Sequence, residues 1–442
     1  MFTREVIAVD CRSELRHKKN ALLPCNFWWW CADYGCRYWN RLPSQPNQFS
    51  RLTGNEKSPL TDITYQGRSM ASLSFHIDEA SGRIDIVSDS QVRPVNALWL
   101  RERAQDTGSL DPITQQRLFD PHMMDPELRI VKVVRLDNGE IRVTFSDGYT
   151  GSYSTSIFLA EFDSSDGLPR AEPWMSDLDQ SRIRFSYLHL DDDRQRLLAM
   201  EAYLRFGAII LQDVPTDPER ILEVAEKFGH VRVTNFGRYF EVYSRPNSND
   251  LAYRPVRLGP HTDNPYREPV PGIQLLHCLI NETSGGDSTL VDSLSVLRDL
   301  AHEDPTGVDL LAKISVKFRF LDGDTELIER RPMIELDHLK RPTGVHYSPR
   351  LDYLPLMDAV TTVAFHRARM RLGEMFSDPR YELRFRLQAG ELMMFDNNRV
   401  LHGRTAFDPN EGRRHLQGCY IDLDGPRGRY KSLARRLAGC LA

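Results

Sequence analysis

The hydrophobic pattern of the chain changes at residues 164–181, where the sequence SSDGLPRAEPWMSDLDQS is rich in Pro, Asp and Ser. Before this stretch, from Ile84 to about Phe162, apolar and polar residues alternate, as is typical of half-buried strands. After it, apolar residues recur at helical spacing and then in short continuous runs. The change predicts a linker between a small β-rich domain, residues 70–165, and a larger domain, residues 180–442.

A β-hairpin is the clearest element of the small domain. The segments RIVKVVRL, residues 129–136, and EIRVTFSD, residues 140–147, both alternate, and Asp137-Asn138-Gly139 lies between them. Asn and Gly both tolerate the positive φ that a tight turn requires. We therefore expect two antiparallel strands joined at Asn138-Gly139.

The larger domain opens with a helix–strand–helix pattern. Residues 191–207 begin with acidic residues and end in glycine, which are signals of helix termini. The apolar run 208–214 predicts a strand, and residues 217–229 predict a second helix. Beyond residue 231 we expect mostly short strands and loops, with another helix near residues 360–375. This order predicts an α+β fold with a β-rich centre.

The first 69 residues have no sustained helical or strand periodicity. They are interpreted as a poorly ordered extension, as a transit segment, or as an over-long gene model with the working start at Met70. Basic residues near the beginning favour a transit segment, and acidic residues in the same stretch count against it. The sequence leaves these three interpretations open.

Composition limits the setting and the partners. The 442 residues, 40% of them hydrophobic, suffice for a large core and a smaller domain. The net charge of -5 is widely spread without a basic stripe, so nucleic acid is not an expected partner. No apolar run reaches the ~18 residues of a membrane span. Seven cysteines without a regular framework fit a reducing compartment, cytoplasmic, or mitochondrial if residues 1–69 are a transit segment.

Two histidines and an aspartate are the candidate metal ligands. In the segment RLGPHTDNPY, His261 and Asp263 lie two residues apart, so on an extended backbone both side chains point to one face. A third ligand, His402, follows an apolar strand in FDNNRVLHGR. Two histidines and one carboxylate occupy one face of an octahedron and leave three positions for substrates, which suits Fe(II) and oxygen chemistry.

An arginine follows the second histidine at a useful distance. If 2-oxoglutarate binds the iron through its keto acid end, its distal carboxylate needs a cation. Arg414, in GRRHLQGCYIDLD, is the candidate, because an arginine offers two parallel charge-assisted bonds to a carboxylate. Its neighbour Arg413 is the competing candidate, with a solvated charge at a strand end as its plainer interpretation. Ser288, in GGDSTLVDS, is expected to add a hydroxyl bond to the same carboxylate.

These residues resemble those of a known family, the γ-butyrobetaine and trimethyllysine hydroxylases among the taurine dioxygenase-like Fe(II)/2-oxoglutarate oxygenases. The segments LGPHTDNPY, PGIQLLHC, GGDSTLVDS, FDNNRVLHGR and RHLQGCYID occur in the family's order, and with LWLRERA they span roughly residues 95–425. The resemblance implies a double-stranded β-helix (jelly roll) carrying His261, Asp263 and His402 as iron ligands. It also implies Arg414, Ser288 and Leu276 around 2-oxoglutarate, ascorbate as an auxiliary reductant, and a homodimer.

The small domain departs from the family where relatives carry a zinc site. The segment WLRERAQDTGSLDP places Ala104, Asp106 and Ser109 at the expected ligand positions, and Tyr149 stands where a histidine is expected. Asp106 alone cannot replace four ligands, so no zinc is expected there.

The substrate pocket departs from the family as well. The resemblance places Phe236, Phe240, Tyr253 and Tyr420 at the positions of an aromatic box for a trimethylammonium group, which binds to aromatic faces by cation–π attraction. Phe240 stands at a tryptophan position and Asn264 at another aromatic one. Asp250 stands where an uncharged, carboxylate-binding Asn is expected, and its charge would repel a substrate carboxylate. Core packing is the alternative role of Phe236 and Phe240.

The sequence therefore predicts an Fe(II)- and 2-oxoglutarate-dependent dioxygenase that hydroxylates an unactivated C–H bond of a small quaternary-ammonium substrate, releasing succinate and CO2. One alternative keeps this chemistry and changes the substrate to a sulfonate, a phosphonate or a specialised biosynthetic intermediate. A second is a non-catalytic oxygenase fold used for binding. Zinc hydrolysis is disfavoured because no convincing general base lies beside the three ligands.

Overall fold

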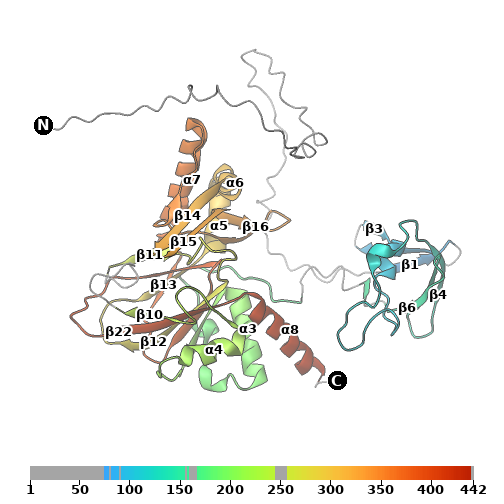
Figure 1. Ribbon diagram of the computed structural model, residues 1–442, viewed down its shortest axis with the longest axis horizontal. Helices are drawn as coiled ribbons and strands as arrows, with labels where there is room; N and C mark the ends of the chain where they lie inside the picture. The colour runs from blue at the N-terminus through green and yellow to red at the C-terminus, as the bar shows by residue number, and fades with distance from the viewer. Residues whose placement is uncertain are drawn as a thin grey trace, which may run out of the picture. The chain divides into compact units, whose positions relative to one another are not determined.

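The computed structural model describes residues 74–78, 81–88, 91–154, 157–158, 167–243 and 256–439. Figure 1 draws these parts in colour. The expectations for residues 1–69 lie outside this range, as do those for Asp250 and Tyr253. No helix of the described parts is long and apolar enough to cross a membrane.

The described residues before 159 form two three-stranded antiparallel sheets, ordered β1-β2-β3 and β4-β5-β6. Their buried side chains, among them Ile84, Leu100, Val143 and Phe145, make one hydrophobic cluster. The elements are β1 (Ser74–Asp78), β2 (Arg83–Ser88), β3 (Gln91–Pro94), α1 (Ala97–Arg101), η1 (Pro121–Met123), β4 (Ile130–Arg135), β5 (Ile141–Phe145) and β6 (Thr150–Tyr153).

The predicted hairpin is confirmed, with one difference in its turn. Strands β4 and β5 pair antiparallel on either side of it. Only Gly139 has a positive φ, +84°, and its N–H donates to the carbonyl of Leu136. The Asn138 side chain instead accepts from the N–H of Glu140. Asn therefore serves here as a side-chain hydrogen-bond acceptor, and the glycine alone supplies the left-handed residue.

Two largely antiparallel sheets form the centre of the larger part. One has seven strands in the order β10-β22-β12-β20-β8-β7, with β9 also pairing with β22, and only β7 and β8 run parallel. The other has the order β11-β21-β13-β19. Their bounds are β7 (Arg184–Ser186), β8 (Ala208–Gln212), β9 (Val231–Arg232), β10 (Phe240–Tyr243), β11 (Leu258–His261), β12 (Ile273–Asn281), β13 (Ser288–Asp292), β19 (Glu382–Phe385), β20 (Leu392–Asp396), β21 (Val400–Arg404) and β22 (Arg414–Ile421).

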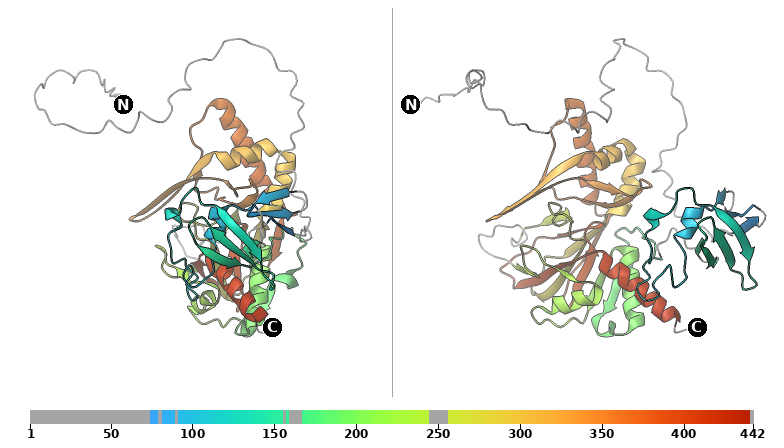
Figure 2. Two further views of the ribbon diagram at one scale, coloured as in Figure 1. Left: turned by 90° about the vertical axis from the view of Figure 1, so that its right-hand side faces the viewer. Right: turned by 45° about the vertical axis from the view of Figure 1, so that its right-hand side comes forward.

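Helices and short sheets surround these strands. Helices α3, α4 and α8 gather on one side and α5, α6 and α7 on another (Figure 1). The hairpin of β14 and β15 extends away from the helices (Figure 2). The bounds are η2 (Gln180–Ile183), η3 (Tyr187–His189), α3 (Asp193–Phe206), α4 (Arg220–Phe228), α5 (Ser293–Glu303), α6 (Pro305–Lys313), β14 (Ser315–Asp322), β15 (Thr325–Pro332), β16 (Ile334–Leu336), β17 (Pro342–Val345), β18 (Asp352–Tyr353), α7 (Ala359–Phe376) and α8 (Asp424–Gly439).

The predicted helix–strand–helix segment is confirmed as α3, β8 and α4. Local signals set the bounds of α3. The Asp192 side chain accepts from two N–H groups of the first turn, and Gly207 ends the helix with a φ of +70°. Such capping satisfies backbone groups that no turn of the helix can pair. The helix expected near residues 360–375 is α7.

One expectation is wrong. Beyond residue 231 the chain also forms helices α5, α6 and α8 and strands of eight or nine residues, in addition to short strands and loops. The stretch expected to be a linker is described from residue 167 onward. Trp174 is buried, its N–H donates to Asp292, and its indole donates to the carbonyl of Phe206. A buried tryptophan with both donors satisfied ties this stretch to the core.

Candidate functional site

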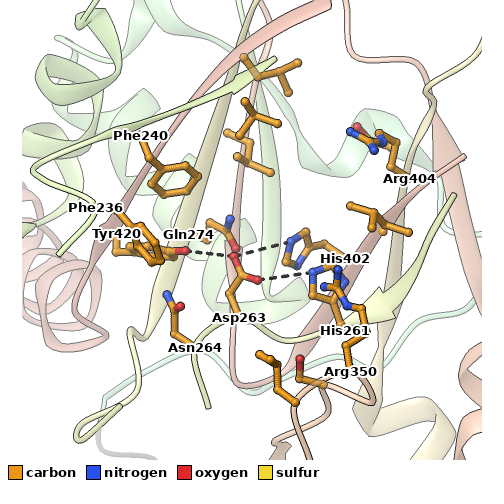
Figure 3. Close-up of a pocket in the computed structure, with 18 of the residues that line it drawn as sticks. Phe236, Phe240, His261, Asp263, Asn264, Gln274, Arg350, His402, Arg404 and Tyr420 are labelled. Atoms are coloured by element: carbon orange, nitrogen blue, oxygen red, sulfur yellow. Dashed lines mark hydrogen bonds and ion pairs between the residues drawn. The ribbon is translucent and has the colours of Figure 1, made fainter. Parts of the chain in front are cut away.

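The two histidines come from neighbouring strands of the four-stranded sheet. His261 ends β11 and pairs with His402 of β21, with 4.3 Å between the ring centroids. Asp263 follows β11, and its carboxylate lies 3.4 Å from Nε2 of His261 and 4.0 Å from Nε2 of His402. Figure 3 shows the three side chains converging on one point. One ligand atom from each lies within 4.8 Å of the others, which is close enough to share a metal ion.

The backbone and carboxylate of Asp263 are both held in place. The side chain of Asn397 accepts from the N–H of Asp263 and donates to its carbonyl, at 2.7 and 2.8 Å. The Tyr420 hydroxyl donates to the carboxylate at 3.0 Å. Sequence reasoning missed Asn397, although it lies in the quoted segment FDNNRVLHGR. Such supporting bonds fix the direction in which a ligand oxygen points.

The histidine rings suit metal binding. Nδ1 of His261 lies 3.0 Å from the carbonyl of Gly259, so a proton on Nδ1 leaves the Nε2 lone pair directed at the site. Burial, with His261 nearby, lowers the pKa of His402 to about 3, so its ring is neutral at physiological pH. Burial raises the pKa of Asp263, but the nearby histidines and the Tyr420 bond together lower it below its ordinary value. Two imidazoles and a carboxylate are the donor set that Fe(II) takes in such sites.

A cavity of about 330 Å³ opens over the three ligands. Aromatic side chains line one part of it, and three guanidinium groups, those of Arg350, Arg404 and Arg414, line another. Ser288 of β13 and Leu276 of β12 also line the cavity, so the structure places both with the triad. The residues predicted around the co-substrate therefore share one cavity with the metal ligands.

Arg414, the first residue of β22, and Arg413 just before it differ in their surroundings. Arg414 is 7% exposed, and the absence of a side chain at Gly286, where φ is +76°, leaves room for its guanidinium. Burial lowers the pKa of Arg414 to about 10, and its Nε has no hydrogen-bond partner among the described residues. The side chain of Arg413 is 74% exposed and pairs with Glu282. The geometry therefore favours Arg414 as the group that meets an anion in the cavity.

The aromatic part of the cavity contains three of the predicted box residues. The rings of Phe240 and Tyr420 lie 5.3 Å apart, and those of Phe236 and Phe240 lie 6.2 Å apart. The Arg267 guanidinium lies 5.5 Å from the Phe236 ring, so that ring already has a cation beside it. Asn264, which stands at a further aromatic position of the family, is 5% exposed and accepts a hydrogen bond from the Tyr266 hydroxyl.

Two of the residues that stand at the zinc-ligand positions implied by the family resemblance, Asp106 and Tyr149, are hydrogen-bonded to each other. The Tyr149 hydroxyl donates a short hydrogen bond to the Asp106 carboxylate, and the Arg101 guanidinium lies 3.6 Å from the Tyr149 ring centroid. This bond lowers the pKa of Asp106, whereas burial raises the pKa of Tyr149. Ala104 and Ser109 are buried close by in the sequence.

Several cavity residues were not predicted from the sequence. Arg404 lies two positions after His402 on β21, so strand alternation turns both side chains to one face, and this signal was available. Gln274 and Arg350 also line the cavity. Gln274 lies in the quoted segment PGIQLLHC, but nothing local to Arg350 points to the cavity.

The sheets and the site together define a class. Two histidines and a carboxylate lie in a cavity with a buried arginine, which is the arrangement of a non-haem iron oxygenase rather than of a closed structural metal site.

Comparisons with known proteins give the family. Residues 169–420 match the family described as taurine catabolism dioxygenase TauD, TfdA family, and the chain belongs to it. The γ-butyrobetaine dioxygenase of Pseudomonas sp. (strain AK-1) is 33% identical over 354 residues, which cover 78% of this chain and 92% of that protein. Dioxygenase str8 of Strobilurus tenacellus is 28% identical over 348 residues, 74% of this chain and 82% of that protein.

The trimethyllysine dioxygenase of Meyerozyma guilliermondii is 31% identical over 225 residues, 50% of this chain and 56% of that protein. These relatives confirm the predicted group of the family, and the chain is an Fe(II)/2-oxoglutarate-dependent dioxygenase.

Proposed function

We propose that this dioxygenase hydroxylates an unactivated C–H bond of a small quaternary-ammonium substrate similar to γ-butyrobetaine. The observation that carries the proposal is the cavity that joins the triad to Phe236, Phe240 and Tyr420. Aromatic faces attract a quaternary ammonium group that cannot form ordinary hydrogen bonds. The relative from Pseudomonas, a γ-butyrobetaine dioxygenase by name, supports the same substrate class.

His261, Asp263 and His402 are proposed to hold the iron. Bound Fe(II), with 2-oxoglutarate and O2, supplies the oxidation of the C–H bond and the release of succinate and CO2. Asn397 and Tyr420 keep the Asp263 carboxylate directed at the site. Arg414 binds the distal carboxylate of 2-oxoglutarate, with Ser288 and Leu276 beside it, because this guanidinium is buried in the cavity and lacks a carboxylate partner among the described residues.

The fold proposed for residues 180–442 is a double-stranded β-helix, preceded by a separate small domain at residues 70–165. Two observations support the double-stranded β-helix. His261 and His402 face each other on antiparallel strands, and β12 pairs with β22 over a long antiparallel stretch. The separate hydrophobic cluster around Ile84 and Phe145 supports the small domain.

The small domain is proposed to bind no zinc. The Asp106 carboxylate is engaged by Tyr149, and the neighbouring positions Ala104 and Ser109 offer no metal-binding charge. Ascorbate as a reductant, a homodimer and a cytoplasmic or mitochondrial location stay expectations from the family resemblance.

The test is coupled turnover. Purified protein loaded anaerobically with Fe(II) is given O2, 2-oxoglutarate and a panel of quaternary amines, sulfonates and phosphonates, and succinate and the hydroxylated product are measured by mass spectrometry. We expect succinate and product in equal amounts with a quaternary amine that carries a carboxylate. Coupled turnover of a sulfonate or phosphonate alone would replace the proposed substrate class. Absence of iron binding would favour a non-catalytic role.

A further inference from the structure

We propose that Arg350 binds an anionic group of the substrate, so that the substrate is a zwitterion held between this guanidinium and the aromatic side chains. The inference rests on the proposed function and adds the residue that selects the anionic end. Figure 3 shows Arg350 on the same side of Asp263 as His261, with Phe236 and Phe240 on the other side. A molecule with a cation at the aromatic end and an anion at Arg350 has its middle carbons over the triad.

The backbone around Arg350 is fastened to the metal-ligand segment. Thr262, between the two ligands of that segment, donates its N–H to the carbonyl of Tyr347 at 2.7 Å. The Tyr347 N–H returns a bond of 2.9 Å to the Thr262 hydroxyl. A turn follows at once, closed by the N–H of Leu351 donating to the carbonyl of Ser348, with Pro349 as its second residue. Arg350 is therefore carried by a fixed turn rather than by a free loop.

The Arg350 side chain is available for a ligand. It lines the cavity, as do its neighbours Ser348 and Leu351, and it forms no hydrogen bond or ion pair with any residue that the structure describes. Arg404 differs, because it is buried and donates to the carbonyl of Val256. Arg414 lies in the pocket assigned to 2-oxoglutarate. Among the three arginines that line the described cavity, Arg350 is therefore the one that remains available to bind the substrate.

The charges of the cavity point to an anion. Asp263 is the single carboxylate among the described residues that line it, against the three arginines. Burial lowers the pKa of Arg404 to about 10, and the positive charges of Arg414 and Arg350 contribute to this shift. Arg350 therefore lies close enough to add to the positive charge of the cavity. A ferrous ion and a 2-oxoglutarate dianion cancel each other in charge, so the excess of positive charge stays. A substrate carboxylate next to Arg350 neutralises this charge locally, while the ammonium end of the same zwitterion lies at the aromatic rings.

The experiment compares two ligands that differ at one end. γ-Butyrobetaine and its carboxamide, 4-(trimethylammonio)butanamide, are titrated by calorimetry into the anaerobic protein loaded with Fe(II) and 2-oxoglutarate. We expect wild type to bind the carboxylate ligand roughly 10- to 100-fold more tightly, the range of a charge-assisted bond. Arg350→Gln should remove this preference, and Arg350→Lys should restore part of it. The dissociation constant of 2-oxoglutarate should stay within about 2-fold in all three proteins, since no hydrogen bond or ion pair joins Arg350 to Arg414 or Ser288 in the shared cavity.

The matched control is Arg367→Gln, which removes an exposed arginine of α7 and should keep the wild-type preference. An Arg350→Gln protein that keeps the preference overturns the inference, and so does a wild type that binds the two ligands equally or binds neither. If wild type fails to bind Fe(II) and 2-oxoglutarate, the proposed function fails as well. If wild type binds Fe(II) and 2-oxoglutarate but shows no preference between γ-butyrobetaine and its carboxamide, only the inference about Arg350 is overturned, and the proposed function stands.

Discussion

Two places in the molecule bring together residues that the family resemblance links to metal sites, and they differ in what those residues bind. In the small domain the Asp106 carboxylate is engaged by Tyr149, and a guanidinium covers the tyrosine ring. In the large domain, ligand atoms of His261, Asp263 and His402 converge on a shared point at the edge of a cavity. In the first place the Tyr149 hydroxyl and the Asp106 carboxylate bind to each other, whereas the three ligand atoms of the second lie close enough to share a metal ion.

The comparison teaches how to judge a metal site from its neighbours. A tyrosine hydroxyl on the carboxylate does not distinguish the two places, since Asp263 accepts one from Tyr420 as Asp106 does from Tyr149. The difference lies in the other ligands, because an isolated carboxylate cannot complete a tetrahedral zinc site. At the triad the supporting bonds come from behind the ligands: Asn397 holds the backbone of Asp263 and Gly259 holds the far nitrogen of His261. These bonds orient the ligand atoms instead of occupying them.

The largest effect is expected from removing a metal ligand. Asp263→Ala should abolish iron binding and lower turnover by roughly 10³-fold or more, because no other carboxylate lines the described cavity. Iron content and coupled succinate formation are the measurements. Asp324→Ala, at an exposed position, is the control. Full iron content in Asp263→Ala would mean that the triad is not the metal site.

Arg414→Gln should raise the KM for 2-oxoglutarate by roughly 10- to 100-fold, with iron content unchanged, because one charge-assisted contact to the distal carboxylate is lost. The adjacent Arg413→Gln serves as the control, since the Arg413 side chain is 74% exposed and paired with Glu282. Equal effects of the two substitutions would contradict the assignment of Arg414.

The small domain should respond in stability rather than in activity. Tyr149→Phe removes the bond to Asp106 and should lower the free energy of unfolding by about 1 kcal/mol, measured by denaturant titration. The pKa of Asp106 is lowered in the folded protein, so its contribution is complete above the ordinary value of 3.8 and is lost as the pH falls through the folded pKa. The difference between wild type and Tyr149→Phe should therefore shrink below about pH 4.

Metal removal separates the two places directly. In the Asp263→Ala background, where the triad cannot hold iron, a chelator should leave the melting temperature of the protein unchanged. Added zinc should not raise it, because the Asp106 region lacks a ligand set. One equivalent of zinc in the purified protein, or a lower melting temperature after chelation, would overturn the proposal that the small domain is free of zinc.

A modest effect is expected at the aromatic part of the cavity. A Cβ at Gly418 would lie 2.3 Å from the Phe240 ring, so Gly418→Ala should push that ring aside. We expect the dissociation constant of γ-butyrobetaine to rise by ~3- to 10-fold as one cation–π contact weakens, with iron binding unaffected. Gly428→Ala, where a Cβ meets nothing within 4 Å, is the control. Equal affinities would argue that Phe240 serves only core packing.

Features that depend on neighbouring residues could be predicted from the sequence, whereas features that depend on contacts between distant segments could not. The bounds of α3 depend on Asp192 and Gly207, which act within one turn and can be read locally. Helix α5 was missed although Asp292 caps it, because its apolar pattern was interpreted as short strands and loops. The triad was found through spacing and family resemblance. The cavity position of Arg350 depends on the pairing of Thr262 with Tyr347, a contact between distant segments that no local pattern contains.

The place of β22 has a consequence for how the protein is made. This strand, the last of the chain's described strands, lies between β10 and β12 inside the seven-stranded sheet, and it carries Arg414 and Tyr420. During synthesis the ribosome must release the chain as far as Ile421 before that gap can be filled, so the sheet and the site are completed together once this strand emerges. A chain that stops before Arg414 lacks the interior of its sheet, and we expect it to be cleared by quality control rather than to persist as a weak enzyme.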